Sequence, residues 1–169
     1  MTRDLNNRTG LNPADARFLD KIEEHGWVVT KVAPRVGDEG ECFAYSTGLY
    51  LRFAQPEIVM FGLPVDIMHG IINNVGNQMK TGVNFLPGRD YADLLERYPC
   101  QFRTVDKSKY SHHLGWSSWF YESLDYPVLQ CFWPDTNGYF PWQSECATAV
   151  RELQPFLYLP FRYEPGPVQ

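Results

Sequence analysis

The chain has 169 residues, of which 44% are hydrophobic and 21% are charged, as in an ordinary globular domain long enough to bury a substantial core. Its formal net charge of −5 at pH 7 argues against a nucleic-acid-binding protein, because contact with a phosphate backbone needs a basic face. No apolar run approaches the roughly 20 residues of a membrane span, and the polar N-terminus lacks an export signal, so we expect a cytoplasmic protein without membrane contact.

The beginning of the chain predicts a flexible arm followed by a helix. Residues 1–12 are polar and lack an apolar pattern. Asn12-Pro13 then places an N-cap asparagine before a proline at the first helical position. Gly26 ends the helix, with His25 in its last turn. We interpret His25 as a structural cation, because a positive charge is favoured at the negative end of the helix dipole.

Three strands are predicted in the next part of the chain. Trp27–Ala33 and Glu41–Thr47 are rich in residues that favour strands, and the polar loop between them makes a hairpin the simplest connection. Glu57–Phe61 is the third strand, because a short apolar run there is bounded by proline and glycine.

Two helices are predicted after the third strand. The first runs from Leu63-Pro64 to about Lys80, because apolar residues recur every three or four positions. His69 borders the polar side of this helix, and we interpret it as a solvated surface residue. Asp90 then acts as the N-cap of a short helix that continues to about Tyr98.

The remaining residues predict two more strands and two helices. Cys100–Val105 and Val128–Trp133 are the strands, and the aromatic-rich segment Ser111–Leu124 between them is expected to be helical. A short helix follows over Ser144–Leu153. The last eight residues, 162–169, form a proline-rich tail.

Together these elements predict one α+β domain over residues 13–161. We expect a mixed or mostly antiparallel sheet of about five strands, packed with three to four helices. Crossovers of helical length, such as the one between Phe61 and Cys100, leave room for some parallel pairing.

Recognised signatures of catalysis and metal binding are absent from the sequence. There is no phosphate-binding loop and no serine elbow, and the four cysteines lack ligand spacing. His112 and His113 are adjacent, and helical neighbours diverge too far to chelate one metal. They could act singly as acid or base, or simply be solvated at a helix start. We therefore assign no catalytic residue, metal or cofactor.

Polar residues gather at the end of the second strand. Tyr45, Ser46 and Thr47 precede Gly48, whose conformational freedom lets a backbone turn or approach a ligand. Hydroxyls and amides there could hold a phosphate or a carbonyl. Ordinary bonds from the hydroxyls to the backbone are the simpler explanation. Arg103, on a strand, could supply a charge for the same anion or pair with a surface acid.

A turn between two tryptophans is the other candidate region. Asp135 lies in a Pro-Asp-Thr-Asn-Gly turn, where its carboxylate is expected to bond turn amides; a role as a recognition anchor is the alternative. Trp133 shares one strand face with Cys131, so we expect it to be buried. Trp142 follows Pro141, which limits strand pairing, so we expect it to pack against the turn and to serve as an interface anchor.

Several of these segments resemble the domain-of-unknown-function 4262 family of bacterial proteins. The shared signatures are Gly26–Val29, Phe43–Leu49, Pro56–Pro64, Leu129–Asp135, Gly138–Trp142 and Gln154-Pro155. The resemblance brings no established activity and therefore implies no catalytic residues. It also suggests a glycine-histidine pair where this chain has Ala54-Gln55, so a catalytic histidine is not available there.

Three classes of function fit these observations. We favour a protein-binding module of the immunity or antitoxin type that neutralises a partner, such as a toxin, in a bacterial cell, because the chain is acidic and rich in aromatic residues. The alternative is a small-ligand-binding domain or enzyme whose pocket is formed by the segments Tyr45–Leu49 and Trp133–Trp142. The third class is a structural subunit of a homo-oligomer, and a homodimer is compatible with the first class too. The residues assigned to ligand or partner binding are Tyr45, Ser46, Thr47, Arg103, Asp135 and Trp142.

Overall fold

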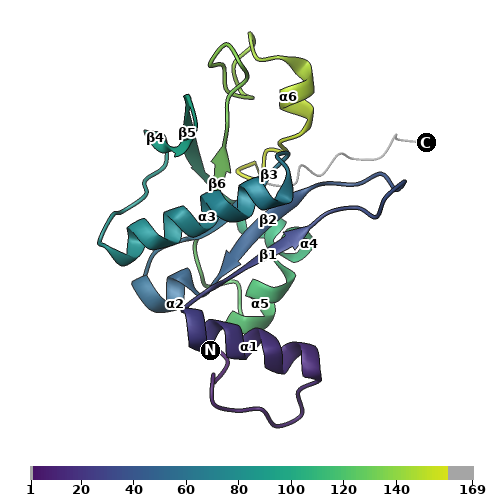
Figure 1. Ribbon diagram of the computed structural model, residues 1–169, viewed down its shortest axis with the longest axis vertical. Helices are drawn as coiled ribbons and strands as arrows, with labels where there is room; N and C mark the ends of the chain where they lie inside the picture. Colours follow the sequence, from purple (N-terminus) through teal and green to yellow (C-terminus); the bar gives the residue numbers. More distant parts are fainter. Residues whose placement is uncertain (1, 160–169) are drawn as a thin grey trace, which may run out of the picture.

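The computed structural model describes residues 2–159, which form a six-stranded sheet with helices on both faces (Figure 1). The strands are β1 (Val28–Val32), β2 (Phe43–Thr47), β3 (Glu57–Phe61), β4 (Asp90–Leu95), β5 (Tyr98–Thr104) and β6 (Val128–Phe132). The helices are α1 (Pro13–His25), α2 (Leu49–Phe53), α3 (Val65–Lys80), α4 (Tyr110–His113), α5 (Gly115–Tyr121) and α6 (Thr148–Glu152), with a 3-10 turn, η1, at Lys107–Lys109.

The sheet is mixed, in the order β1-β2-β3-β6-β5-β4. The central strands β3 and β6 are parallel, and every other neighbouring pair is antiparallel. The predicted α+β architecture with one sheet is therefore confirmed. The described residues contain one more strand and more helices than predicted.

The extra strand is β4, where the prediction of a short helix from Asp90 to Tyr98 is wrong. Arg97 has a positive φ of 71°, and the chain turns there from β4 into β5. The ring of Tyr91 packs on Phe102, with ring centroids 5.4 Å apart. Alanine, leucine and glutamate favour a helix locally, but pairing with β5 and this aromatic contact outweigh that preference.

Three other parts of the chain differ from the predictions. Helix α2 follows Gly48 directly, in a stretch for which no element was predicted. The predicted helix Ser111–Leu124 is divided into α4 and α5 at Leu114, whose φ and ψ of −114° and 47° are not helical. The predicted helix Ser144–Leu153 is reduced to the short helix α6.

Each face of the sheet has its own hydrophobic core, because side chains alternate along every strand. Figure 1 shows α3 across one face and α4 and α5 on the other. In the central strand β3, Ile58 and Met60 face α3, whereas Val59 and Phe61 face the opposite core. All five residues of β3 are buried, so the continuous apolar run of its sequence is explained by burial on both faces.

The N-terminal segment, which we predicted to be a flexible arm, contacts α5 and α1. The backbone N–H of Arg3 donates to the carbonyl of Phe120 at 2.8 Å, and its guanidinium lies over the ring of Trp119. Arg8 forms an ion pair with Asp20 at 2.6 Å. Within residues 2–159, no helix combines the length and apolar character that a membrane crossing requires. The predicted proline-rich tail lies outside the described residues.

Candidate functional site

The hydroxyl-rich end of β2 surrounds a buried carboxylate. Glu57, the first residue of β3, is fully buried. One of its oxygens accepts a hydrogen bond from the hydroxyl of Ser46 at 2.5 Å. The other accepts from the backbone N–H groups of Gly48 at 2.7 Å and Tyr50 at 3.2 Å, and from the hydroxyl of Tyr121. Burial raises the pKa of Glu57, and these four bonds oppose the rise.

The predicted ligand hydroxyls are consequently engaged within the protein. Thr47 lies 2.7 Å from the hydroxyl of Ser117, which in turn contacts the carbonyl of Ser46 at 3.0 Å. The hydroxyl of Tyr45 accepts the backbone N–H of Trp116 at 3.0 Å. Ser46 and Thr47 are fully buried. All three hydroxyls bond within the fold. The simpler explanation, bonds to the backbone, describes Tyr45, whereas Ser46 donates to the side chain of Glu57 and Thr47 bonds that of Ser117.

Two residues predicted for binding, Arg103 and Trp142, lie in contact. The guanidinium carbon of Arg103 is 4.1 Å from the centroid of the Trp142 ring and 5.3 Å from that of Tyr158. Trp142 also stacks on Phe140, in the turn, at 5.0 Å. The face of Trp142 is thus covered by a cation–π contact within the chain.

Asp135 holds its own turn together. One carboxylate oxygen accepts the N–H groups of Asn137 at 2.9 Å and Tyr139 at 3.0 Å, and the other accepts that of Ala147 at 2.9 Å. These bonds, that from Ala147 foremost, hold the pKa of Asp135 below its ordinary value. Both carboxylate oxygens of Asp135 are thereby occupied by hydrogen bonds from the backbone of residues 137–147.

The two segments proposed to form a shared pocket lie at opposite ends of the sheet. Because β2 is antiparallel to β3, its last residue, Thr47, lies at the end where β3 and β6 begin. Segment Trp133–Trp142 follows the other end of β6, and Figure 1 shows this separation. Tyr45–Leu49 and Trp133–Trp142 therefore do not converge on one pocket.

His113 is packed into the fold rather than solvated, contrary to our simpler interpretation. Its ring stands edge-on to Phe43 and Phe61, with centroids 5.3 and 5.1 Å away. Its Nε2 lies 3.0 Å from the carboxylate of Glu41, and 13% of its side chain is exposed. Within residues 2–159, no group of three or more His, Cys, Asp or Glu side chains could hold a metal ion.

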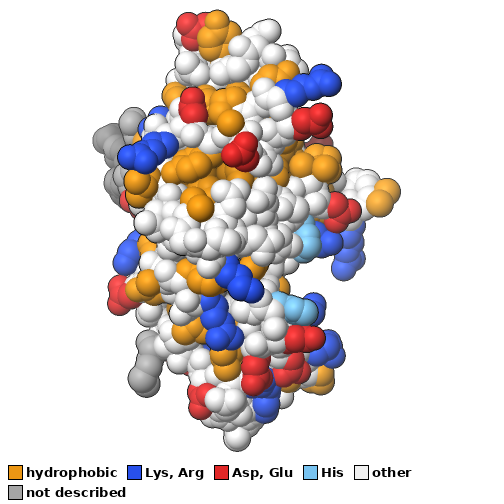
Figure 2. Space-filling model, turned by 60° about the vertical axis from the view of Figure 1, so that its left-hand side comes forward, with side chains coloured by type: hydrophobic (Ala, Val, Ile, Leu, Met, Phe, Trp, Pro, Cys, Tyr) orange, Lys and Arg blue, Asp and Glu red, His pale blue; other side chains and the backbone are white. Residues whose placement is uncertain are grey.

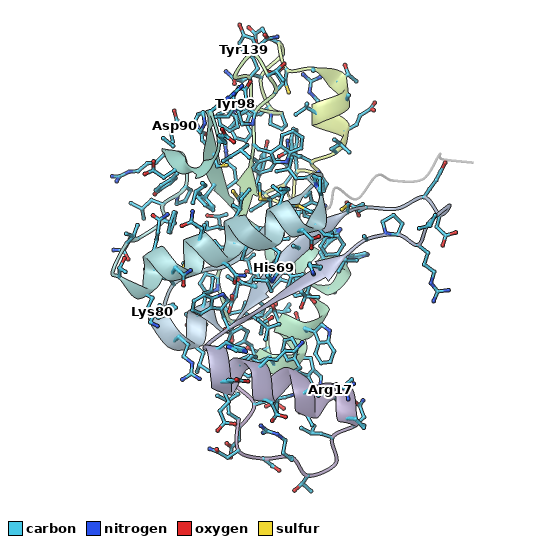
Figure 3. All side chains as sticks on the ribbon, in the orientation of Figure 1. Arg17, His69, Lys80, Asp90, Tyr98 and Tyr139 are labelled. Carbon is cyan, nitrogen blue, oxygen red and sulfur yellow. The ribbon has the colours of Figure 1, made fainter. Side chains whose placement is uncertain are left out.

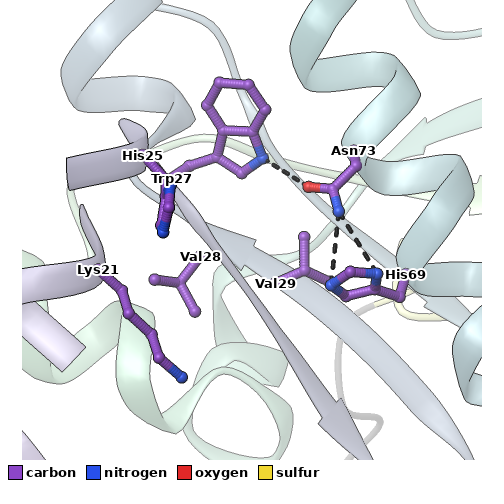
Figure 4. Close-up of a pocket in the computed structure, with 7 residues that line it drawn as sticks. All are labelled: Lys21, His25, Trp27, Val28, Val29, His69 and Asn73. Atoms are coloured by element: carbon purple, nitrogen blue, oxygen red, sulfur yellow. Dashed lines mark hydrogen bonds between the residues drawn. The ribbon is translucent and has the colours of Figure 1, made fainter. Parts of the chain in front are cut away.

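A hollow that the sequence did not reveal opens where α1, β1 and α3 meet (Figure 4). It has a volume of about 400 Å³. Lys21 and His25 come from α1, one helical turn apart, and His69 and Asn73 come from α3 with the same spacing. The other lining residues are Trp27, Val28 and Val29.

A hydrogen-bonded chain fixes the polar side of this hollow. The indole N–H of Trp27 donates to the side-chain oxygen of Asn73 at 2.9 Å, which orients the amide so that its nitrogen faces the ring of His69 at 3.4 Å. In the sequence, the only signal for these two residues was their four-residue spacing beside the apolar stripe of α3. That spacing cannot show that α1 lies opposite.

A second hollow, of about 250 Å³, continues from the first along the same strand. The two share Lys21, Val28 and Val29, and the second extends to Arg17 on α1 and Trp116 on α5. Its other lining residues are Ala14, Phe18 and Thr30. Among residues 2–159, β1 is an edge strand that pairs only with β2, and the two adjoining hollows lie along it. We call these two hollows and the unpaired edge the β1 groove.

Gly76 of α3 sets the position of Trp27 at the β1 groove. A methyl group at Gly76 would lie 2.7 Å from two carbons of the indole. We expect Gly76→Ala to lower the free energy of unfolding by about 1–3 kcal/mol, because the tryptophan must move and lose its bond to Asn73. Urea denaturation followed by tryptophan fluorescence measures this loss.

Gly70→Ala is the matched control, since a methyl group at Gly70 of the same helix meets no atom within 4 Å. We expect it to stabilise the protein by about 0.5–1 kcal/mol through helix propensity. Equal effects of the two substitutions would contradict the close packing of Trp27 against α3.

Comparison with known proteins identifies the family of the chain. Neither the curated proteins nor the solved structures that were compared contain a match. The family model for a domain of unknown function, DUF4262, matches residues 21–147, which include β1 to β6 and the groove residues from Lys21 onward. Since the match covers well over half of the 169 residues, this chain belongs to the DUF4262 family.

Proposed function

We propose that this protein is a binding module of the immunity or antitoxin type, which neutralises a partner protein in a bacterial cell. The observation that carries the proposal is the β1 groove, an unpaired strand edge between the walls of α1 and α3. An extended segment of a partner can add to such an edge, where main-chain hydrogen bonds give affinity and hollows for alternate side chains give selectivity.

The two edges of the sheet differ in a way that favours β1 for binding. Strand β4 has a register shift between Tyr91 and Leu95, and it carries the exposed acids Asp90 and Asp93. Bulges and charges are the features that protect an edge against pairing. Strand β1 carries one exposed charge, Lys31, but it pairs with β2 over five consecutive residues without a register shift, and its valines are half-buried. Its regular edge is therefore the better template for a partner strand.

The other candidate polar residues are bonded or packed within the fold, and this supports binding over catalysis. Glu57 and Asp135 accept hydrogen bonds from the fold, and His113 is packed edge-on against two aromatic rings. Figure 2 shows charges of both signs scattered among hydrophobic side chains on one face of the molecule. Such a mixed surface suits protein contacts, whereas nucleic acid requires a basic field.

The experiment is co-expression with each candidate toxin encoded beside this gene, scored by pull-down and by rescue of growth. We expect one toxin to be bound and neutralised. Ala14→Trp, which places an indole in the wall of the second hollow, should abolish rescue without changing the net charge. Circular dichroism checks that the variant is folded.

Ala149→Trp is the matched control for Ala14→Trp. Ala149 is also an exposed alanine at the second position of a helix, α6, and it does not line the β1 groove. It should rescue as the parent does. Absence of binding to every adjacent candidate, or full rescue by Ala14→Trp, would refute the proposed role of the groove.

A further inference from the structure

The charges around the β1 groove identify the chemistry of its occupant. We propose that the groove binds an extended, acidic segment of a partner protein, with its backbone along β1 and its acidic side chains directed toward α1. This inference rests on the proposed protein-binding function and adds to it the nature of the bound segment.

A basic row faces the groove from α1. Arg17, Lys21 and His25 recur every fourth residue, which places them on one side of a helix. Two acids of the same helix, Asp20 and Glu23, lie 2.6 and 3.4 Å from the guanidinium of Arg8. The residues that line the two hollows include these three basic side chains and no aspartate or glutamate.

Arg17 and Lys21 have no ion-pair partner among residues 2–159. His25 lies 3.6 Å from Glu24, and Lys31 of β1 lies 3.1 Å from Asp66 of α3, so the charges of these two residues have local partners. The uncompensated positive charge beside the groove therefore comes from Arg17 and Lys21.

This local charge differs in sign from the whole molecule. The chain carries a net charge of −5, which alone would favour a basic partner. At physiological ionic strength, however, charges more than about 8 Å apart are largely screened, so the cations nearest the groove determine what binds in it. An acidic segment can form ion pairs with Arg17 and Lys21, whereas these two residues would repel a basic segment.

The geometry favours a peptide over a small anion. Side chains one turn apart on α1 are separated by about 6 Å along the helix, close to the ~6.7 Å between alternate side chains of a strand. Figure 1 shows α1 and β1 diverging from the turn that joins them, and Figure 3 labels Arg17 on α1. An extended chain can bond the unpaired edge of β1 along its length, which a compact anion cannot do.

The test measures binding of two fluorescently labelled peptides by anisotropy at low salt, one of alternating glutamate and threonine and one of alternating lysine and threonine. We expect the acidic peptide to bind and its affinity to fall as salt is added. The double variant Arg17→Glu with Lys21→Glu should bind it at least about tenfold more weakly and should prefer the basic peptide.

Lys80→Glu with Arg89→Glu is the control, since it changes the net charge equally at exposed residues outside the groove. It should leave acidic-peptide binding within about twofold of the parent. Stronger binding of the basic peptide to the parent, no binding of the acidic one, or an equal loss in both double variants would overturn the inference.

Failure of this inference is distinguishable from failure of the proposed function. If Ala14→Trp abolishes toxin rescue while Arg17→Glu with Lys21→Glu leaves it intact, the groove binds a partner that is not acidic. If Ala14→Trp also leaves rescue intact, the groove is not the binding surface.

Discussion

Replacement of Glu57 by alanine is expected to lower the free energy of unfolding by about 3–5 kcal/mol. The carboxylate accepts bonds from the hydroxyls of Ser46 and Tyr121 and from the backbone N–H groups of Gly48 and Tyr50. Alanine would leave these donors buried without an acceptor and would open a cavity. Urea denaturation at neutral pH measures the loss.

Glu57→Gln is the control, because an amide keeps the volume and one accepting oxygen. We expect it to cost much less than alanine. The glutamine variant also isolates the pH dependence that Glu57 causes. Since burial raises the pKa of Glu57 in the folded state, this carboxyl ionises at a lower pH in the unfolded chain than in the folded protein. The parent therefore loses stability between the ordinary carboxyl pKa and the folded pKa, and the glutamine variant lacks this loss. Equal costs of both substitutions, or parallel pH profiles, would contradict the buried-carboxylate assignment.

The elements predicted correctly are those whose ends are encoded locally. The amide oxygen of Asn12 accepts the N–H of Asp15 at 2.8 Å, and Gly26 has a φ of 93°, so α1 begins and ends at the residues that signalled it. The bounds of β3 agree because proline precedes it and Gly62, with a φ of 89°, follows it. Strand β4 was missed because its conformation depends on pairing with β5, which no local preference encodes.

The role of a site residue could be predicted from the sequence only where its hydrogen-bond partners are its neighbours in the sequence. Asp135 bonds turn amides, as its turn sequence indicated. Ser46 was singled out for its hydroxyl, but the sequence could not show that Glu57 would face it across two strands. Likewise Trp27 and Asn73 are 46 residues apart and meet only when α3 packs on the sheet. The β1 groove depends on such tertiary contacts throughout.

Replacement of Trp133 by alanine is the second large effect we expect, a loss of about 3–5 kcal/mol in unfolding free energy. Its side chain is 8% exposed within the core beneath α3, and its indole N–H donates to the carbonyl of Phe61 at 2.7 Å. Alanine would remove both the buried ring and this donor. Trp133→Phe, which keeps a ring, should cost less and leave mainly the carbonyl unsatisfied.

Trp142→Ala provides the comparison that separates core from surface. Trp142 is only half-buried, and its contacts are the rings of Phe132 and Phe140 and the guanidinium of Arg103. We expect its loss to cost clearly less than the loss of Trp133, because less apolar area is removed from the core and, within residues 2–159, no indole N–H bond to the backbone is lost. Guanidinium chloride denaturation of both variants ranks the two costs. A smaller cost for Trp133→Ala than for Trp142→Ala would contradict the inference, drawn from the burial of Trp133, that this residue is the structural tryptophan that anchors the end of β6. The tryptophan of the turn, Trp142, would then be the structural one.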